Sequence, residues 1–244
     1  MKTFGLVIFL SLIVGPFSLA NFSEDENFDH QSPEEVEAAR LQIQREFSDA
    51  ILPSSLSPKE KMIILNQYQH LDPKNEVPQD LLESAVLYFD MNKDKFPNQN
   101  YLVVINYAAR SDHFRFFVVN LISGNVDKYH TAHGRGSDPD DDGYATSFGN
   151  VNNSGKSSLG FARTGEVYSG KFQRAIRLDG LSLTNSNIRS RAIVVHGSDK
   201  VHERTEIQGR SLGCPGLDRH VKDSVIDKIQ GGTLINMGYS IKKM

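Results

Sequence analysis

The sequence predicts a mostly β domain that is preceded by a shorter α-helical segment. Up to residue 96, apolar residues recur at helical spacing behind Ser-Pro and Pro-x-Asp starts. From residue 97 onward, short β-rich runs alternate with turns of Gly, Asn, Asp and Ser. The 244 residues, 39% of them apolar, suffice for one sizeable core or two modest ones. We therefore expect a helical segment over residues 33–96 and a β-rich domain over residues 97–244.

Residues 1–20 are typical of a cleaved secretory signal peptide. Lys2 precedes an apolar run, Phe4–Val14, and Ser18-Leu19-Ala20 forms a small-x-small cleavage site. The run is short for a membrane span, so we expect no stable span after cleavage and an exported protein, periplasmic or associated with the cell wall. The alternative is an uncleaved N-terminal anchor. Residues 21–32 are acidic and polar without periodicity, and we expect them to form a disordered linker.

Three helix starts follow. Ser32 and Ser57 each precede a proline and have a glutamate three residues later, Glu35 and Glu60, which is the capping-box pattern. A third start begins at Pro78. Because apolar residues repeat on one side of each segment, we expect three amphipathic helices whose apolar sides belong to the core rather than to a cofactor or partner groove.

The β-rich region predicts a three-stranded meander followed by shorter strands and one helix. The meander comprises Tyr101–Tyr107, Phe114–Asn120 and Val126–Thr131, joined by short polar turns. The later predicted strands are Phe161–Arg163, Val167–Tyr168, Ala175–Leu178, Arg191–His196 and Thr233–Met237, with a helix over Asp218–Ile229.

Residues 134–158 form a long loop rich in Gly, Ser, Asp and Asn, which predicts a functional or a mobile segment. Asp138 to Gly143 matches the first half of a calcium-binding loop, D-x-D-x-D-G. The position that should be a bidentate glutamate is Gly149, and neither flank is helical in pattern. A solvated acidic loop is favoured, and calcium binding stays open.

Charge and ligand spacing exclude other classes of function. The chain has 27 Lys plus Arg against 30 Asp plus Glu, a net charge of −3, and so no basic footprint for nucleic acid. His196, His202 and Cys214 fit no usual zinc spacing, and His202 is expected to be solvated. We expect no metal and no cofactor. Nothing in the sequence indicates an oligomeric state.

The single cysteine, Cys214, is the strongest candidate for chemistry. Exported proteins usually pair their cysteines, so an unpaired one is intermolecular or reactive; the alternative is a buried small hydrophobe. A cysteine nucleophile needs a base and backbone N–H groups to bind the oxyanion. His196, which ends an apolar run, and the Ser211–Cys214 turn meet these two needs. Activation by His196 predicts a thiolate that persists below the usual thiol pKa.

The order of motifs then becomes specific. His196-Gly197, followed by Gly209-Arg210-Ser211-Leu212-Gly213-Cys214-Pro215, resembles the signature of the murein L,D-transpeptidase catalytic domain family, in the subgroup with H-G and then G-R-S-x-G-C-P. The stretches Ala132–Ser137, Ser157–Gly160 and Gly165–Tyr168 are similar to landmarks of that subgroup in the same order. The resemblance covers roughly residues 97 to 240.

The resemblance implies a β-sandwich-like catalytic domain and an acyltransferase. Cys214 would attack the L-centre of the third residue of a peptidoglycan stem tetrapeptide, expel the terminal D-alanine and form a thioester. A neighbouring stem amine would then make a 3→3 cross-link, or a free D-amino acid would be exchanged in. His196 would be the base, the carbonyl of Gly197 would orient it, and the N–H groups of Gly213 and Cys214 would form the oxyanion hole.

Two further readings remain open. Water as acceptor would make the protein an L,D-carboxypeptidase or endopeptidase of the same fold. A protein that keeps the fold without activity would be a non-catalytic cell-wall-binding protein.

Substrate recognition departs from the family pattern. Many members have a histidine before the Gly-Cys pair and an arginine soon after it, where this chain has Leu212 and Pro215-Gly216. The candidates to replace that cation are Arg191, Arg210 and Arg135. Ser211 and Arg210 are expected either to contact substrate or to shape the turn, and His133 either to line the cleft or to be structural.

Overall fold

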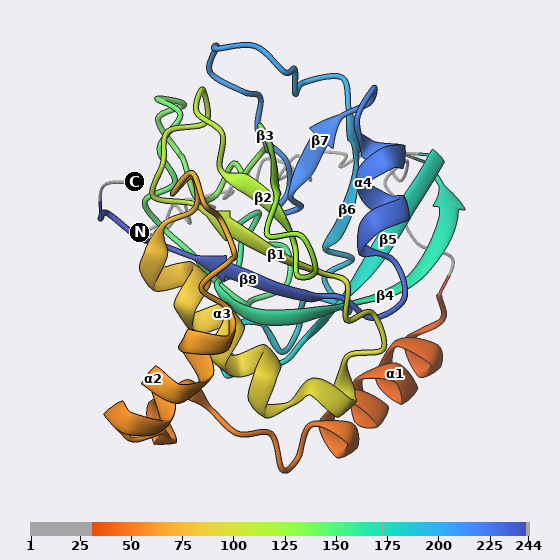
Figure 1. The fold of residues 1–244 in the computed structure, drawn as a ribbon. Coiled ribbons are helices and arrows are strands. Elements are labelled where there is room, and N and C mark those ends of the chain that lie inside the picture. Colours follow the sequence, from red (N-terminus) through yellow and green to blue (C-terminus); the bar gives the residue numbers. More distant parts are fainter. Residues whose placement is uncertain (1–30, 172, 243–244) are drawn as a thin grey trace, which may run out of the picture.

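One continuous mixed sheet of eight strands organises the computed structural model, which describes residues 31–171 and 173–242 (Figure 1). The strand order is β3-β2-β1-β8-β4-β5-β6-β7, and neighbours are antiparallel except for the parallel pairs β1–β8 and β6–β7. The bounds are β1 Tyr101–Asn106, β2 Phe116–Asn120, β3 Val126–Tyr129, β4 Gly160–Gly170, β5 Gln173–Gly180, β6 Val194–Ser198, β7 Gly216–Asp218 and β8 Leu234–Gly238. The mostly β fold with N-terminal helices is confirmed. The predicted signal peptide over residues 1–20 and nearly all of the linker lie outside the described residues.

The three predicted N-terminal helices are present at their predicted starts. They are α1 Pro33–Glu46, α2 Pro58–Gln67 and α3 Gln79–Met91. In α1, Ser32 Oγ accepts from the Glu35 N–H at 3.2 Å and Glu35 Oε2 accepts from the Ser32 N–H at 2.7 Å, so the capping box is complete. The same reciprocal bonds close the start of α2. None of the described helices is long and apolar enough to cross a membrane.

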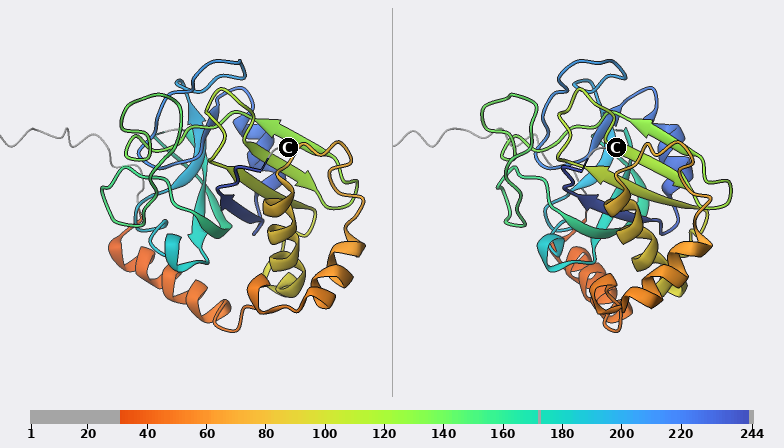
Figure 2. Two further views of the ribbon diagram at one scale, coloured as in Figure 1. Left: turned by 90° about the vertical axis from the view of Figure 1, so that its left-hand side faces the viewer. Right: turned by 60° about the vertical axis from the view of Figure 1, so that its left-hand side comes forward.

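The sheet has a core on each of its two sides, because side chains of a strand alternate between faces. Val103 and Ile105 of β1 join one cluster, which also contains Cys214 and the apolar side of α4, Lys222–Ile229. Leu102 and Val104 join the other cluster, which α2 and α3 cover. In Figure 2, α1 in red and α2 in orange lie at the bottom of the molecule in both views.

The second cluster crosses the boundary predicted near residue 97. Tyr88 of α3 stacks on Phe161 of β4, with ring centroids 4.1 Å apart. Phe47, just past α1, packs edge-on against Phe96 at 5.5 Å, and Arg163 of β4 pairs with Glu46. The helical segment therefore shares its core with the sheet.

Several strand predictions need correction. The meander is confirmed as β1, β2 and β3, but the two short runs predicted near residues 161 and 167 belong to one strand, β4. Its register with β5 shifts between Thr164 and Val167, which breaks the expected alternation. The strand predicted from Arg191 begins only at Val194, because Ala192 has a positive φ of 50° that is incompatible with extended backbone. His196 therefore lies within β6 and not at its end.

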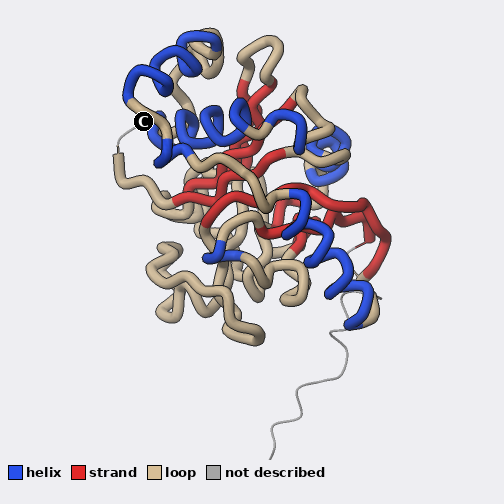
Figure 3. Tube along the Cα trace, turned by 90° about the horizontal axis from the view of Figure 1, so that it is seen from below, coloured by secondary structure: helices blue, strands red, loops and turns tan. Residues whose placement is uncertain are grey.

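The loop over residues 134–158 contains no helix and no strand apart from an isolated bridge at Gly134, as predicted. Hydrogen bonds nevertheless hold it in a defined conformation. The Ser137 carbonyl accepts from the N–H groups of Thr146 and Ser147 at 2.7 and 3.2 Å, and the Gly136 N–H donates to the Gly155 carbonyl at 2.9 Å. Figure 3 shows long stretches of loop, in tan, gathered on one side of the sheet. We call residues 134–158 the loop layer, and this segment contributes polar contacts to the candidate site.

Candidate active site

The pairing of β6 with β7 brings His196 close to the cysteine turn. His196 lies opposite Gly216 in register, and a Cβ on Gly216 would be 3.8 Å from His196 Cε1. Cys214 precedes Gly216 by two residues, and its carbonyl accepts from the Gly216 N–H at 3.0 Å. Its Sγ lies 3.7 Å from the carbonyl oxygen of Ala192, just before β6. The β6–β7 end of the sheet thus places the two candidate catalytic residues near one another.

The imidazole of His196 has a defined tautomer. The side chain is only 4% exposed, and Nδ1 lies 2.8 Å from the carbonyl oxygen of Gly197. Because a carbonyl only accepts, Nδ1 carries the proton and Nε2 carries the lone pair. Burial lowers the pKa of His196 below its usual value, although the hydrogen bond to Gly197 opposes this shift. The imidazole is therefore a neutral base near neutral pH.

The thiol of Cys214 is protonated at neutral pH. Burial raises its pKa to about 11, even though a backbone hydrogen bond to Val194 and the charge of Arg191 act in the opposite direction. The expectation of a thiolate persisting below the usual thiol pKa is therefore wrong for this state. An attack by this sulfur would therefore require a base that removes the thiol proton during the attack, rather than before it.

The turn before Cys214 is closed by Ser211. Ser211 Oγ donates to the Cys214 carbonyl at 2.7 Å and accepts from the Gly213 N–H at 3.0 Å. The Gly213 N–H, predicted as half of the oxyanion hole, is thus already engaged. No hydrogen bond within the described residues is donated by the Cys214 N–H. Within the described residues the N–H groups of Leu212 and Cys214 are thus both open, and that of Cys214 belongs to the candidate nucleophile itself.

Position 213 requires glycine for two reasons. Its φ is +126°, a conformation that side chains rarely adopt. A Cβ there would also lie 2.6 Å from the Lys156 carbonyl oxygen and 2.8 Å from Ile193 Cδ1. The loop at residue 156 therefore packs directly against the turn.

Ser157 belongs to the site although it was not among the predicted site residues. It is fully buried, and its Oγ accepts from the Gly134 N–H at 3.0 Å and donates to the Gly213 carbonyl at 3.2 Å. The sequence marked Ser157–Gly160 only as a landmark, because no spacing rule connects residue 157 to residue 213.

The surroundings of His133 favour the structural alternative over a position in the cleft. The ring is 1% exposed, with Nδ1 2.9 Å from Arg115 Nη2 and Nε2 3.0 Å from Asp138 Oδ2. Because a guanidinium only donates, Nδ1 accepts and Nε2 donates to the carboxylate. Burial and the charge of Arg115 lower the pKa of His133 to about 4. Both ring nitrogens are occupied inside the protein.

The three candidate arginines differ in what already binds them. Arg210 pairs with Asp141, with Nε 2.9 Å from Oδ1, and donates to the Asp138 carbonyl. Arg191 donates to the Gly149 carbonyl at 2.8 Å and to Ser158 Oγ at 2.7 Å, among other acceptors of the loop. These two side chains, like that of Ser211, are half-buried and already form hydrogen bonds within the protein.

Arg135 is the exception. Its side chain is exposed, and no hydrogen bond or ion pair of its guanidinium occurs within residues 31–171 and 173–242. Its backbone N–H donates to the Ser211 carbonyl at 2.8 Å, beside an isolated bridge between Gly134 and Ser211. A cation without a carboxylate partner thus lies beside the cysteine turn.

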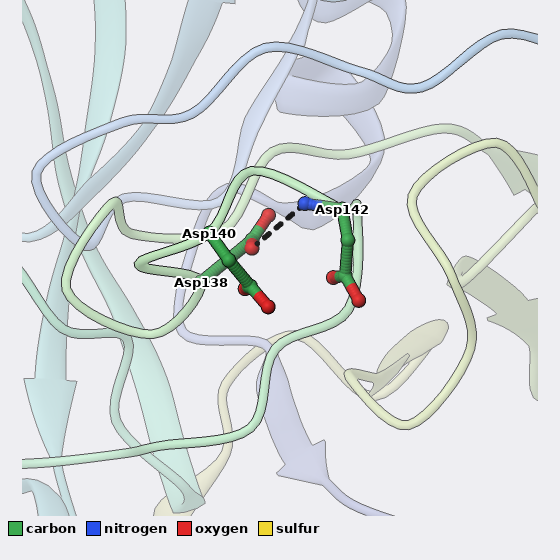
Figure 4. Close-up of side chains that lie close together, drawn as sticks. All are labelled: Asp138, Asp140 and Asp142. Carbon is green, nitrogen blue, oxygen red and sulfur yellow. Dashed lines mark hydrogen bonds between the residues drawn. The ribbon is translucent and has the colours of Figure 1, made fainter.

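The acidic loop brings Asp138, Asp140 and Asp142 together (Figure 4). One carboxylate oxygen from each lies within 4.8 Å of the others, and this is the only such His, Cys, Asp or Glu group among the described residues. Asp138 already accepts from the N–H groups of Asp142 and Gly143, at 3.2 and 3.1 Å, and from His133. The buried carboxylate of Asp138 therefore stabilises the turn of residues 138–143 through hydrogen bonds to its backbone. His202, half-buried, does not form such a group with His196 and Cys214.

The solved structures similar to this chain are distant. One is the helical cell shape determining protein Pgp2 from Campylobacter jejuni, with 13% identity and a TM-score of 0.37, covering 60% of this chain and 50% of that one. Another is an L,D-transpeptidase from Xylanimonas cellulosilytica, with 15% identity and a TM-score of 0.33, covering 66% of this chain and 70% of that one. The chain thus spans about half the length of Pgp2. No curated protein matches it.

A family model gives the assignment. The model described as the L,D-transpeptidase catalytic domain matches residues 73–237, which begins between α2 and α3 and ends in β8. The match includes β6, the Ser211–Cys214 turn and the loop layer around them. Because it spans more than half of the 244 residues, the chain belongs to the L,D-transpeptidase catalytic domain family.

Proposed function

We propose that the protein is an exported cysteine L,D-transpeptidase that forms a thioester with a peptidoglycan stem tetrapeptide. The observation that carries the proposal is the pairing of β6 with β7, which places His196 opposite Gly216, two residues after Cys214. Both candidate side chains are buried, and Nδ1 of His196 lies 2.8 Å from the Gly197 carbonyl oxygen. Membership in the family makes peptidoglycan the expected substrate. Residues 1–20 support export, although they lie outside the described residues.

Acylation requires a proton transfer that these two neutral groups can perform. The Cys214 sulfur attacks the carbonyl carbon of the third stem residue while its proton passes to Nε2 of His196. The imidazolium that forms keeps its Nδ1 bond to the Gly197 carbonyl. When the tetrahedral intermediate collapses, the C–N bond to D-alanine breaks and His196 transfers its proton to the leaving amine. A thioester on Cys214 remains.

Deacylation reverses the roles. An acceptor amine attacks the thioester, the proton it loses passes to His196, and the departing sulfur recovers a proton as the C–S bond breaks. In both steps negative charge develops on the former carbonyl oxygen. The Cys214 N–H would bind that oxyanion, since the Gly213 N–H is bound to Ser211 Oγ.

Arg135 is our candidate for the carboxylate of the acyl donor. A guanidinium binds a carboxylate through two parallel hydrogen bonds, and Arg191 and Arg210 are already engaged. Replacing Arg135 with Gln should raise KM for a tetrapeptide by about tenfold and leave kcat nearly unchanged. Arg40→Gln in α1 is the matched control, and equal effects of the two variants would exclude this role.

Intact-protein mass spectrometry tests the function as a whole. Incubation with a disaccharide tetrapeptide should add the mass of the substrate without D-alanine to the wild type and nothing to Cys214→Ala. Cross-linked dimers would identify an amine acceptor, exchanged tetrapeptides a D-amino acid acceptor, and tripeptide monomers water. Absence of an adduct and of every product, with retained binding to sacculi, would favour the non-catalytic alternative and reject the proposal.

A further inference from the structure

The peptide group that joins Gly213 to Cys214 has two ends with different partners. Its carbonyl accepts from Ser157 Oγ at 3.2 Å, and its N–H donates no hydrogen bond within the described residues. We infer that Ser157 is a positioning residue that orients and polarises this peptide so that the Cys214 N–H binds the oxyanion. The inference rests on the proposed function and adds a residue to it.

The direction of the Ser157 bond follows from its partners. Its Oγ accepts from the Gly134 N–H at 3.0 Å, so the hydroxyl hydrogen is free to donate elsewhere. The Gly213 carbonyl can only accept. Ser157 is fully buried, so water does not compete for either bond.

Ser157 is itself held at both ends of its backbone. Its N–H donates to Ser137 Oγ at 3.0 Å, and its carbonyl accepts from the Gly149 N–H at 3.0 Å. The preceding carbonyl, of Lys156, accepts from Arg191 Nη2 at 2.5 Å and packs against Gly213. These backbone hydrogen bonds therefore fix the position of the Ser157 hydroxyl relative to the cysteine turn.

The bond from Ser157 affects both the polarity and the orientation of the Gly213–Cys214 peptide. A donor on the carbonyl increases the dipole of the peptide and strengthens the N–H as a donor at its other end. The bond also fixes the rotation of the peptide, while Ser211 fixes the groups on either side of it. The N–H is then oriented before the substrate arrives, which is the condition for effective charge stabilisation.

Two adjacent serines offer a matched test. Ser158 is also buried, but its Oγ donates to the Gly149 carbonyl at 2.8 Å and accepts from Arg191, and it forms no hydrogen bond with Gly213. We expect Ser157→Ala to slow formation of the Cys214 thioester with a tetrapeptide by about tenfold, through kcat rather than KM. Alkylation by iodoacetamide forms no oxyanion, so its rate should stay within about twofold of the wild type.

The outcomes separate the possible explanations. Equal slowing of acylation and alkylation, or the same selective slowing in Ser158→Ala, would overturn the inference. A wild type that never acylates would instead reject the proposed function. Thermal denaturation of each variant checks that it is folded.

A second measurement decides the matter if Ser157→Ala does not fold. Because Cys214 is the only cysteine, labelling with carbonyl-¹³C glycine and ¹⁵N cysteine isolates the Gly213–Cys214 peptide as one NMR correlation. In the wild type we expect the Gly213 carbonyl shift to change when the hydroxyl hydrogens are exchanged for deuterium. An unchanged shift would show that no hydroxyl donates to this carbonyl and would overturn the inference.

Discussion

Both sides of the sheet have an apolar core, and they differ in the role of single hydrogen bonds. On the helical side, Phe89 and Phe96 are at most 1% exposed and pack in an aromatic cluster with centroids 5.9 Å apart. On the side of Cys214, single polar atoms determine the geometry, as Ser211 and Ser157 do for the cysteine turn. Apolar packing is non-directional, whereas a hydrogen bond depends on the position of each atom. Loss of apolar contact on the helical side should therefore lower stability without changing the rate of reaction, whereas loss of a polar contact at the cysteine turn should change the rate.

Replacing His196 with Gln should give the largest effect on the reactive side. Without a base, the acylation rate of Cys214 should fall by about 10²–10⁴-fold. In the wild type the acidic limb of the rate profile should lie below pH 6.5, because burial lowers the pKa of His196 from that value. Time-resolved intact mass measures both. Wild-type rates in His196→Gln would show that another group takes the thiol proton.

Replacing Phe89 with Ala should give the largest effect on the helical side. The cavity should lower the free energy of unfolding by about 3–5 kcal/mol, because the side chain is almost fully buried. The acylation rate per folded molecule should not change. Chemical denaturation and active-site titration measure the two quantities, and a selective loss of rate would contradict the division between the two sides.

His133 makes the loop layer sensitive to pH. Its pKa is lowered to about 4, so at intermediate pH the unfolded chain binds a proton that the folded chain does not. Stability is full above about pH 6.5 and should fall by about 3 kcal/mol as the pH drops to 4. Denaturation at a series of pH values measures this slope. His133→Gln keeps an acceptor and a donor and should flatten it, whereas an unchanged slope would assign the dependence to other groups.

The cap of α2 should give the smallest effect. Ser57→Ala removes the acceptor of the Glu60 N–H and should lower the free energy of unfolding by about 1 kcal/mol. The exposed Ser54 is the control residue, and its replacement by Ala should be nearly neutral. A change in acylation rate upon loss of this cap would show that the helical layer is coupled to the site.

The sequence alone determined the features that depend on residues close together in the chain, such as helix starts and the motifs of the family. Capping boxes at Ser32 and Ser57 predicted the starts of α1 and α2, because a cap needs only residues three positions apart. The order of motifs predicted the family, and the Cys214 turn and His196 were recognisable from it. The three-residue strand β7 was missed, since so short a strand has no alternation to detect.

Only the tertiary structure decided which hydrogen-bond donors and cations already have partners and which groups are protonated. The Gly213 N–H is bound by Ser211, His133 lies between Arg115 and Asp138, and burial keeps the Cys214 thiol protonated. Ser157 reaches Gly213 across 56 positions of the chain. Such contacts depend on distance and desolvation between segments far apart in sequence, and residue types at local spacing contain no information on either.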